Sequence, residues 1–352
     1  MNKKKKVVFL YAELAGYVIT CLEYLSRNND HLEIYVFHFP VNAIAPFNFH
    51  DTFVNSRVKY ICVANTSEGD LPSDVGNLSP DLIICSGWIS KNYIRVCKKF
   101  HDKCTTVLAF DTQNLNTARN KIGRMYLKIK VKSFFKFAFV PGSSQAEFAK
   151  SIGFNENEIL KGFYCCDLDL FSKSYIFDKR IDKKFVYVGR FVPEKGVHLL
   201  SRAFKELQDD GKILDWELVL IGKGNLNQYV SKNIIVHEFM QPKVLSEFMK
   251  SKSVFVLPST YEPWGVVLQE FTAAGFPVIC SDKVGSSEVF LEENKNGFYF
   301  EAGNLASLKN AMLKFSLLSS DQMKQMGNLS HVLSKKINLE QWSESINILL
   351  KN

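Results

Sequence analysis

Residues 254–279 read VFVLPSTYEPWGVVLQEFTAAGFPVI and carry the strongest structural signal in the chain. The apolar run 254–257 is typical of a buried strand, and Gly265 marks the start of a helix. Gly275 and Pro277 then lead into a second apolar run. Continuous apolar strands separated by a helix indicate a parallel sheet that is covered on both faces.

The same alternation of apolar runs and helical segments occurs in two series along the chain. The first series comprises 7–11, 34–39, 60–63, 82–85, 106–110 and 137–140, and the second comprises 185–188, 217–221, 234–237, 254–257, 278–280 and 298–300. We therefore predict an α/β protein with two doubly wound, Rossmann-like domains that face an interdomain cleft. Ligands of such sheets bind beyond the carboxyl ends of the strands, so the chemistry is expected there.

Length also favours two domains, because a single core rarely grows beyond roughly 250–300 residues, and this chain has 352. We place an N-terminal domain at 1–165, a C-terminal domain at 166–335 and a C-terminal helix at 336–352. Trp342, Ile346 and Leu349 form an apolar stripe at helical spacing. This helix is therefore expected to pack back on the N-terminal domain.

The composition is that of an ordinary folded protein, with 46% hydrophobic and 23% charged residues, and argues against disorder. The eight cysteines form no CxxC pair, so we expect reduced thiols and no zinc site. A redox pair of the adjacent Cys165 and Cys166 is the lesser alternative, since neighbouring cysteines bridge only with strain. The lysine-rich start resembles a signal peptide, but Glu13 interrupts the apolar run that follows, which favours a strand. No run of about 18 apolar residues occurs, so we expect a cytoplasmic protein with only peripheral membrane contact.

Three segments of the second series share a further pattern. Glu262 and Glu270 are separated by seven residues and lie on either side of Gly265. FVYVGRFVPEKG (185–196) and LVLIGKG (218–224) each join an apolar strand to a glycine turn with a basic residue, and Asp167 and Phe171 lie in the expected linker. In this order the segments resemble the family 4 retaining glycosyltransferases, which have the GT-B fold. The resemblance covers the C-terminal domain, whereas the N-terminal half is similar only in architecture.

The helix that begins at Gly265 is the expected anion site. The N–H groups of the first turn, including those of Val266 and Val267, would point into the cleft together with the positive end of the helix dipole. A diphosphate in the cleft could accept hydrogen bonds from these N–H groups. The resemblance implies that Glu270, further along this helix, binds the ribose hydroxyls of a nucleotide. A solvated glutamate on a surface helix is the alternative.

The remaining charged residues of this domain are assigned by the same resemblance. It implies that Glu262 contacts the donor hexose and helps to stabilise an oxocarbenium-like transition state; Pro263 favours an extended backbone there. Arg190 and Lys195, close to Gly189, are suited to neutralise a leaving diphosphate without a metal. A solvated loop glutamate and structural ion pairs are the alternatives.

We expect no metal ion and no cofactor, because the string Asp167-Leu-Asp169, which looks like a DxD motif, falls in the linker. Gly222 and Lys223 follow a buried strand and are expected near the nucleotide. A plain turn also explains the glycine. Residues that would flank the base follow the next strand: Phe239 and Met240.

The N-terminal domain departs from the family pattern. Its first loop offers only Gly16, and the expected histidine position carries Asp111 in the sequence LAFDTQ (108–113). We expect Asp111 to take the place of that histidine beside the anomeric carbon, unless the resemblance fails locally.

From 112 to 146 the chain has no acidic residue, while cations recur every three or four positions: Lys121, Arg124, Lys128, Lys132 and Lys136. On a helix these cations would share one face, next to an apolar face formed by Ile122, Met125, Tyr126 and Ile129. Together with the net charge of +8, this pattern favours contact with an anionic membrane. The alternative is a core-packed helix with a solvated outer face. Nucleic acid is not expected, because no binding motif accompanies the cations.

These observations lead to one main hypothesis. We expect a retaining hexosyltransferase that moves a hexose from a UDP- or GDP-linked sugar to a hydroxyl of a surface-glycan acceptor, lipid-linked, at the inner face of the membrane. A nucleotide-sugar epimerase or a phosphorylase of the same fold is an alternative. A catalytically silent nucleotide-sugar-binding subunit is another, suggested by the missing histidine.

Overall fold

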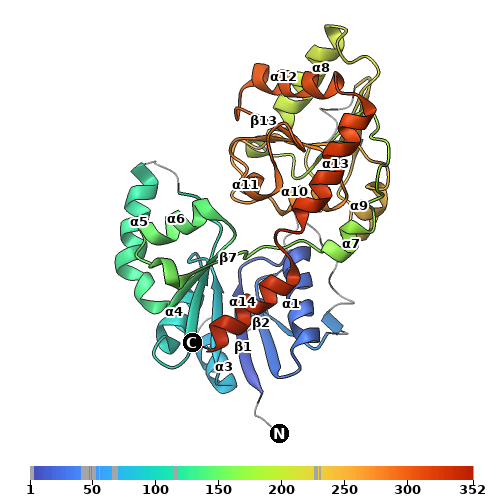
Figure 1. Cartoon of the computed structure of the whole chain (residues 1–352). Helices are drawn as coiled ribbons and strands as arrows, with labels where there is room; N and C mark the ends of the chain where they lie inside the picture. The colour runs from blue at the N-terminus through green and yellow to red at the C-terminus, as the bar shows by residue number, and fades with distance from the viewer. Residues whose placement is uncertain are drawn as a thin grey trace. The chain divides into compact units, whose positions relative to one another are not determined.

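The computed structural model describes residues 4–40, 47, 49, 53–54, 56–65, 70–114, 118–225, 229 and 231–351, with the backbone alone for 118–121. The chain divides into two compact units (Figure 1). Unit 1 comprises Met1–Cys165 and Asn338–Asn352, and unit 2 comprises Cys166–Ile337. The chain therefore passes between the units twice, at 165/166 and at 337/338.

Within the described part of unit 1, seven strands form one parallel sheet in the order β3-β2-β1-β4-β5-β6-β7. The strands are β1 (Lys5–Tyr11), β2 (Leu32–His38), β3 (Lys59–Cys62), β4 (Leu82–Ser86), β5 (Thr105–Ala109), β6 (Phe137–Val140) and β7 (Ile159–Lys161). The helices are α1 (Gly16–Asn28), α3 (Leu71–Leu78), α4 (Lys91–Phe100), α5 (Ala118–Lys130), α6 (Ser143–Ser151) and α14 (Leu339–Lys351), with short 3₁₀ turns η1 (Val63–Asn65), η2 (Lys132–Phe134) and η3 (Glu156–Glu158).

Unit 2 repeats this design with six strands among its described residues, in the order β10-β9-β8-β11-β12-β13. The strands are β8 (Lys184–Val188), β9 (Glu217–Ile221), β10 (Ile234–His237), β11 (Val254–Leu257), β12 (Val278–Ser281) and β13 (Gly297–Phe300). The helices are α7 (Leu168–Ser172), α8 (Val197–Asp209), α9 (Pro242–Phe248), α10 (Val266–Ala273), α11 (Ser287–Phe290), α12 (Leu305–Ser316) and α13 (Ser320–Ser334), with a 3₁₀ turn η4 (Pro193–Lys195).

The strand order of each sheet reverses once. In unit 2 the chain runs outward from β8 through β9 to β10 and then returns to β11 on the other side of β8. The loops that leave the carboxyl ends of β8 and β11 therefore diverge from adjacent strands, which is where doubly wound sheets hold their ligands.

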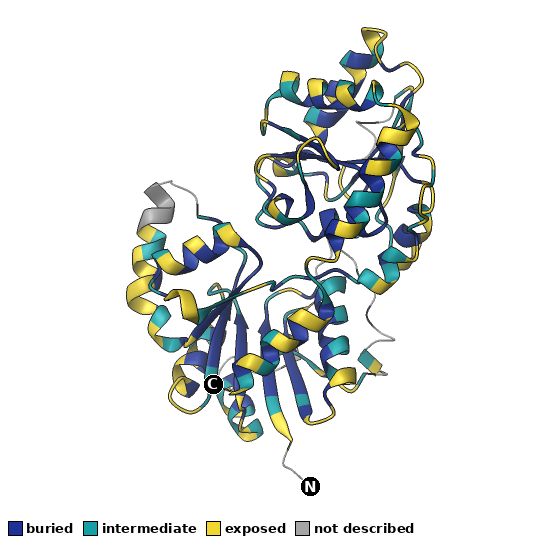
Figure 2. Cartoon of the chain, in the orientation of Figure 1, coloured by how far each residue is buried: buried dark blue, intermediate teal, exposed yellow. Residues whose placement is uncertain are grey.

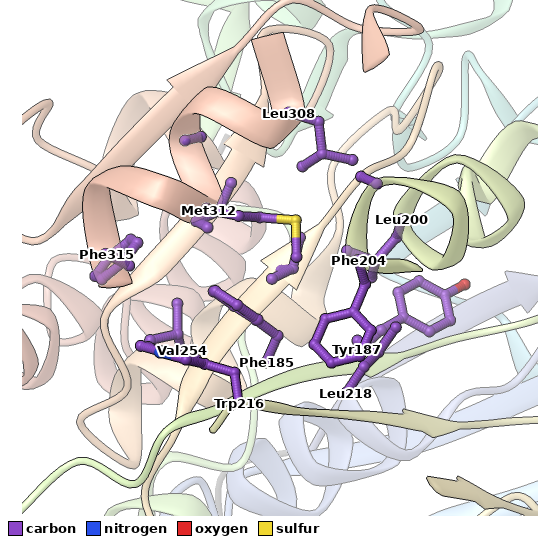
Figure 3. Close-up of a cluster of buried hydrophobic side chains, with 14 of the residues drawn as sticks. Phe185, Tyr187, Leu200, Phe204, Trp216, Leu218, Val254, Leu308, Met312 and Phe315 are labelled. Atoms are coloured by element: carbon purple, nitrogen blue, oxygen red, sulfur yellow. The ribbon is translucent and has the colours of Figure 1, made fainter. Parts of the chain in front are cut away.

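Aromatic side chains fill the core of unit 2 and fix the position of β8 (Figure 3). Phe185 of β8 stacks on Trp216, with ring centroids 4.4 Å apart. Phe204 of α8 and Met312 and Phe315 of α12 are buried in the same cluster. Each such side chain contributes about 1.5–3 kcal/mol of burial free energy. The loop that follows β8 is thus held on a rigid strand.

The last helix of the chain belongs to unit 1. In α14 the side chains of Trp342, Ile346 and Leu349 are buried, whereas the outward side of the helix is exposed (Figure 2). The Trp342 indole Nε1 donates to the Phe163 carbonyl at 2.8 Å. The second crossing lies at 337/338, two residues beyond the boundary expected from the sequence.

The edge strand β7 was not predicted, because its three residues are not buried and give no apolar run. The eight cysteines, Cys165 and Cys166 among them, all lie within the described residues and form no disulfide bond. In the part of the chain that the structure describes, no helix has the length and apolar character needed to span a bilayer.

Candidate functional site

Loops at the carboxyl edge of the unit 2 sheet come into direct contact. A Cβ on Gly222, after β9, would lie 1.8 Å from the carbonyl oxygen of Gly189, after β8. Gly196 has a φ of +66°, and a Cβ there would lie 2.1 Å from the carbonyl oxygen of Pro258, after β11. Glycine is required at these approaches because any side chain would collide with backbone. The three loops therefore form one continuous surface.

Lys195 and Glu262 form an ion pair on this surface. The Lys195 ammonium donates to Glu262 Oε2, to which the Ser259 hydroxyl also donates at 3.2 Å. The lysine and glutamate side chains are only 17% and 9% exposed, and a carboxylate so little hydrated needs such partners. Thr260 binds the Glu194 carbonyl through its N–H at 2.8 Å and its hydroxyl at 3.2 Å, which fastens the loop of Lys195 to the loop of Glu262.

The loop after β12 supports Glu262 from the other side. Glu262 exchanges two backbone hydrogen bonds with this loop, at 3.2 and 3.0 Å. The Ser281 hydroxyl donates to the Ser259 carbonyl at 2.5 Å, and the Ser286 hydroxyl donates to the Gly265 carbonyl at 3.0 Å. The sequence gives no local signal for these two serines, because their partners are carbonyl groups in other loops.

The helix α10 begins at this surface with an unusual residue. Gly265 has a φ of +87°, and a Cβ on it would lie 2.8 Å from Glu262 Cγ. Gly265 has no side chain that could cap this N-terminus. The N–H groups of the first turn of an α-helix have no partner within the helix, so they are suited to bind an anion. The backbone of Gly265 and the side chain of Glu262 are consequently in contact.

Glu270 lies one and a half turns further along α10 and is half-buried. Burial, assisted by the nearby Asp167 carboxylate, raises the pKa of Glu270 to about 7. Asp167 itself caps α7, where its carboxylate accepts the Leu170 N–H at 2.9 Å. Near neutral pH the Glu270 carboxyl can thus accept or donate a hydrogen bond, and ligand hydroxyls that donate to it would favour the ionised form.

Other predicted residues lie in separate loops of the same edge. Arg190 is exposed after β8, where its carbonyl accepts a hydrogen bond of 2.7 Å from the buried Tyr187 hydroxyl. Lys223 is exposed after β9, and its carbonyl accepts a backbone hydrogen bond of 2.9 Å from the loop after β8. Phe239 and Met240, after β10, are half-buried.

Gly16 and Asp111 belong to unit 1. The Tyr164 hydroxyl hydrogen-bonds to the Asp111 carboxylate, and burial, with nearby negative groups, raises the pKa of Tyr164 well above its usual value. The ring of Tyr17 packs edge-on against Tyr164, with centroids 5.2 Å apart. Gly16 begins α1, so Tyr17 comes from its first turn. The two tyrosines were missed, since nothing in the sequence connects either of them to Asp111.

The predicted five-cation face is wrong in its second half. The helix α5 ends at Lys130, because Val131 turns into the core and is 3% exposed. Lys132 lies in η2 and pairs with Glu158 at 3.2 Å. Lys136 lies beyond the helix, just before β6. Only Lys121, Arg124 and Lys128 of the predicted set are on α5, and the side chain of Lys121 lies outside the described residues.

The apolar face of α5 is turned to solvent. Its four members are 60–69% exposed, namely Ile122, Met125, Tyr126 and Ile129. Leu127, on the opposite side, is buried and holds the helix on unit 1. The outer face of α5 is therefore largely apolar, whereas the alternative was a core-packed helix with a solvated outer face.

The class of protein follows from the architecture. Two parallel sheets with helices, joined in this order, form the GT-B fold of two Rossmann-like domains. The chain is similar in fold to HepE of Anabaena, solved in complex with UDP, with a TM-score of 0.75 over 98% of this chain and 99% of that chain at 15% identity.

Sequence comparison finds similar proteins within that class. Residues 173–330 match the family "Glycosyl transferases group 1". The chain is 30% identical over 221 residues, 60% of each chain, to an uncharacterized glycosyltransferase of Methanocaldococcus jannaschii. It is 26% identical over 144 residues, 39% of this chain and 37% of the other, to the UDP-Gal:alpha-D-GlcNAc-diphosphoundecaprenol alpha-1,3-galactosyltransferase of Escherichia coli. The matches thus span 60% or less of the length of these relatives.

Proposed function

We propose that the protein is a family 4 retaining hexosyltransferase that transfers a hexose from a nucleoside diphosphate sugar to a hydroxyl of a lipid-linked surface-glycan acceptor. The observation that carries this proposal is the Lys195–Glu262 pair beside the N-terminus of α10 at the carboxyl edge of unit 2. These residues lie inside the segment that matches the glycosyltransferase family. The galactosyltransferase relative, whose name gives a UDP-linked donor and a diphosphoundecaprenol acceptor, supports the substrate classes.

In this proposal the donor diphosphate lies against the N-terminus of α10. The N–H groups of Val266 and Val267 and the helix dipole favour an anion there, and Gly265 permits its close approach. Arg190 and Lys195 supply the positive charge that would otherwise come from a metal ion. Glu270 accepts hydrogen bonds from the ribose. The residues assigned to the nucleotide and its base are Gly222, Lys223, Phe239 and Met240.

The proposed reaction exchanges one bond for another on the same face of the sugar. The bond from the anomeric carbon to the diphosphate oxygen breaks, and a bond from that carbon to the acceptor oxygen forms. The acceptor proton passes to the departing diphosphate oxygen. Glu262 stabilises positive charge on the sugar, while Lys195, which pairs with Glu262, stabilises negative charge on the leaving group. Asp111, held by Tyr164, is the proposed acidic group of unit 1.

A transfer assay tests the proposal. The protein is incubated with UDP-glucose, UDP-galactose or GDP-mannose and undecaprenyl-diphosphate-linked N-acetylglucosamine, and the anomeric configuration of the product is read by NMR. We expect retention with one of these donors and about a hundredfold lower turnover in Glu262→Gln. Glu194→Gln is the matched control, because Glu194 is exposed in the adjoining loop and its loss should change turnover less than about twofold. An inverted product, or equal rates in the two variants, would contradict the mechanism.

We further propose that α5 rests on an anionic membrane, where a lipid-linked acceptor would be located. Ile122, Met125, Tyr126 and Ile129 are spaced three and four residues apart and so form one apolar stripe on the solvent-exposed side of α5. On a helical projection the exposed Lys128 and Lys130 fall on opposite sides of this stripe. Each cation near such a surface contributes about 1 kcal/mol.

Vesicle co-sedimentation tests the membrane proposal. The double variant Ile122→Ser with Ile129→Ser is expected to bind phosphatidylglycerol vesicles at least about fivefold less than the unmodified protein. Leu317→Ser is the control, since Leu317 is 84% exposed but lies in unit 2. Binding should also weaken as salt is raised. Equal loss in the control, or binding that ignores both lipid charge and salt, would reject α5 as the docking element.

A further inference from the structure

Gln269 contacts both places where the chain passes between the units. It lies in α10 and is 0% exposed. Its Oε1 accepts the N–H of Cys166, the first residue of unit 2, at 2.9 Å. Its Nε2 donates to the carbonyl of Ile337, the last residue of unit 2, at 2.7 Å, and to that of Ser334 at 2.9 Å. One side chain therefore holds the entering and the leaving segment of unit 2.

The chemistry of these contacts requires an amide. A glutamine side chain offers two N–H donors and a carbonyl acceptor, and all of these functions are used here. The hydrogen bonds to the Cys166 N–H and the Ser334 carbonyl are buried, and the one to the Ile337 carbonyl is partly buried. Removal of the amide would take one hydrogen-bond partner from each of these backbone groups. A glutamate could keep the bond to Cys166 but not the two bonds to carbonyl groups. An apolar residue would lose all three.

The same helix carries the proposed donor site. Gly265 begins α10, and Glu270 directly follows Gln269. Cys166 is bonded to Gln269, while the neighbouring Asp167 lies close enough to Glu270 to raise its pKa. Both residues of the entering segment thus interact with consecutive residues of α10. The helix α10 is therefore bonded to both segments.

We infer that Gln269 is a positioning residue that fastens both crossover segments to the donor helix, so that α10 and the two ends of unit 2 move as one body. This inference rests on the proposed function for its catalytic consequence. Gln269 does not touch the substrate in this scheme. It fixes the positions, relative to the donor helix, at which the chain enters and leaves unit 2.

Three variants separate this role from general stabilisation. Gln269→Leu removes all three hydrogen bonds, and Gln269→Glu keeps only the acceptor for Cys166. Gln208→Leu is the matched control, because Gln208 also donates to two carbonyls, those of Ile213 and Trp216, and accepts one N–H, from Asn233 at 2.9 Å. Those partners all lie within unit 2 and away from both crossovers.

The first measurement is hydrogen exchange, which needs no enzymatic activity. In Gln269→Leu, peptides that cover Cys166 and peptides that cover 335–340 should exchange about tenfold faster or more. In Gln269→Glu only the second group should change. Gln208→Leu should leave both groups unchanged. If Gln269→Leu does not fold, the split pattern of Gln269→Glu decides the question.

The second measurement compares the effect of each variant on kcat with its effect on nucleotide binding. We expect kcat to fall about tenfold in Gln269→Leu, while the dissociation constants for UDP and GDP stay within about twofold of those of the unmodified protein. Unchanged exchange at both crossovers, or equal kinetic losses in the Gln208 control, would overturn the inference. If the unmodified protein transfers no sugar, the proposed function fails but the exchange experiment still decides the role of Gln269.

Discussion

Glu262 owes its position to side chains from other loops as much as to its own backbone. Lys195 and Ser259 both donate to the same carboxylate oxygen. Their loops follow β8 and β11, which are neighbours in the sheet although about seventy residues separate them in the chain. The candidate glutamate is therefore oriented before any ligand is considered.

Glu270 makes the stability of unit 2 depend on pH. Its pKa in the folded protein, about 7, lies above its ordinary value of 4.5, so the folded state binds a proton more tightly than the unfolded state. This contribution to stability is fully present below pH 4.5 and is lost as pH rises through 7. The loss amounts to at most about 3 kcal/mol.

Chemical denaturation at about pH 5.5 and about pH 8 measures this effect. Glu270→Gln should reduce the difference in unfolding free energy between the two conditions by about 1–2 kcal/mol. Glu301→Gln is the control, because Glu301 is exposed on the surface of the same unit. The same pH dependence in all three proteins would mean that Glu270 titrates normally.

The roles of individual residues in the candidate site were only partly predictable from the sequence. Local pattern was sufficient for Gly265, because a helix start after a buried strand needs a residue that permits a close approach. It could not show the hydrogen bond from Tyr164 to Asp111, since these residues are brought together only by the folded sheet. Ser281 and Ser286 were missed for the same reason. Their partners are carbonyl groups of another loop, for which the sequence has no signal.

The start of α10 provides a prediction about an element. Gly265→Ala places a Cβ 2.8 Å from Glu262 Cγ at a φ of +87°, and we expect unit 2 to lose about 1–3 kcal/mol of stability and Glu262 to be displaced. Gly303→Ala is the matched control, because Gly303 has a φ of +76° but nothing within 4 Å of its added Cβ. Thermal unfolding and a sugar-transfer assay should therefore distinguish the two variants. We expect Gly265→Ala to unfold at a lower temperature and to transfer less sugar, whereas Gly303→Ala should retain transfer. Similar transfer by both would show that the close approach is unimportant.

Among the elements, strands with a continuous apolar run were predictable and the short β7 was not. The strands 217–221, 234–237 and 254–257 have the predicted bounds, because each contains an uninterrupted run of apolar residues. The helix α5 shows the opposite case. Its charge periodicity continues to Lys136, but burial of Val131 in the core ends the helix earlier. Tertiary packing thus overrides a surface pattern.

At the scale of the whole molecule, α14 is the element that completes unit 1. Trp342 packs near Phe9 and Phe139, with ring centroids 6.2 and 6.4 Å away. Trp342→Ala should cost about 3–5 kcal/mol, because it removes a large buried ring. Limited proteolysis with mass spectrometry should show new cleavage in unit 1 first. Trp216→Ala, in the core of unit 2, should give the reverse order, and identical cleavage patterns would contradict this assignment of α14.

The division of the chain was the most accessible property of the sequence. An expected boundary at 165/166 follows from the restart of the strand pattern, and the units divide at that position. The second boundary lies two residues beyond the expected one, at Ile337, whose carbonyl accepts a hydrogen bond from Gln269. The contact lies about seventy residues from Gln269 in the chain and has no local signature.

The return of α14 makes unit 2 an insertion within the sequence of unit 1. On the ribosome, residues 166–337 emerge before the helix that covers Phe9 and Phe139 has been translated. The amino-terminal half of this protein therefore cannot finish folding first, although nascent domains usually mature in the order of their synthesis. Unit 2 can reach its native state while the apolar surface awaiting Trp342 is still uncovered, and that nascent surface is where chaperone protection would matter most.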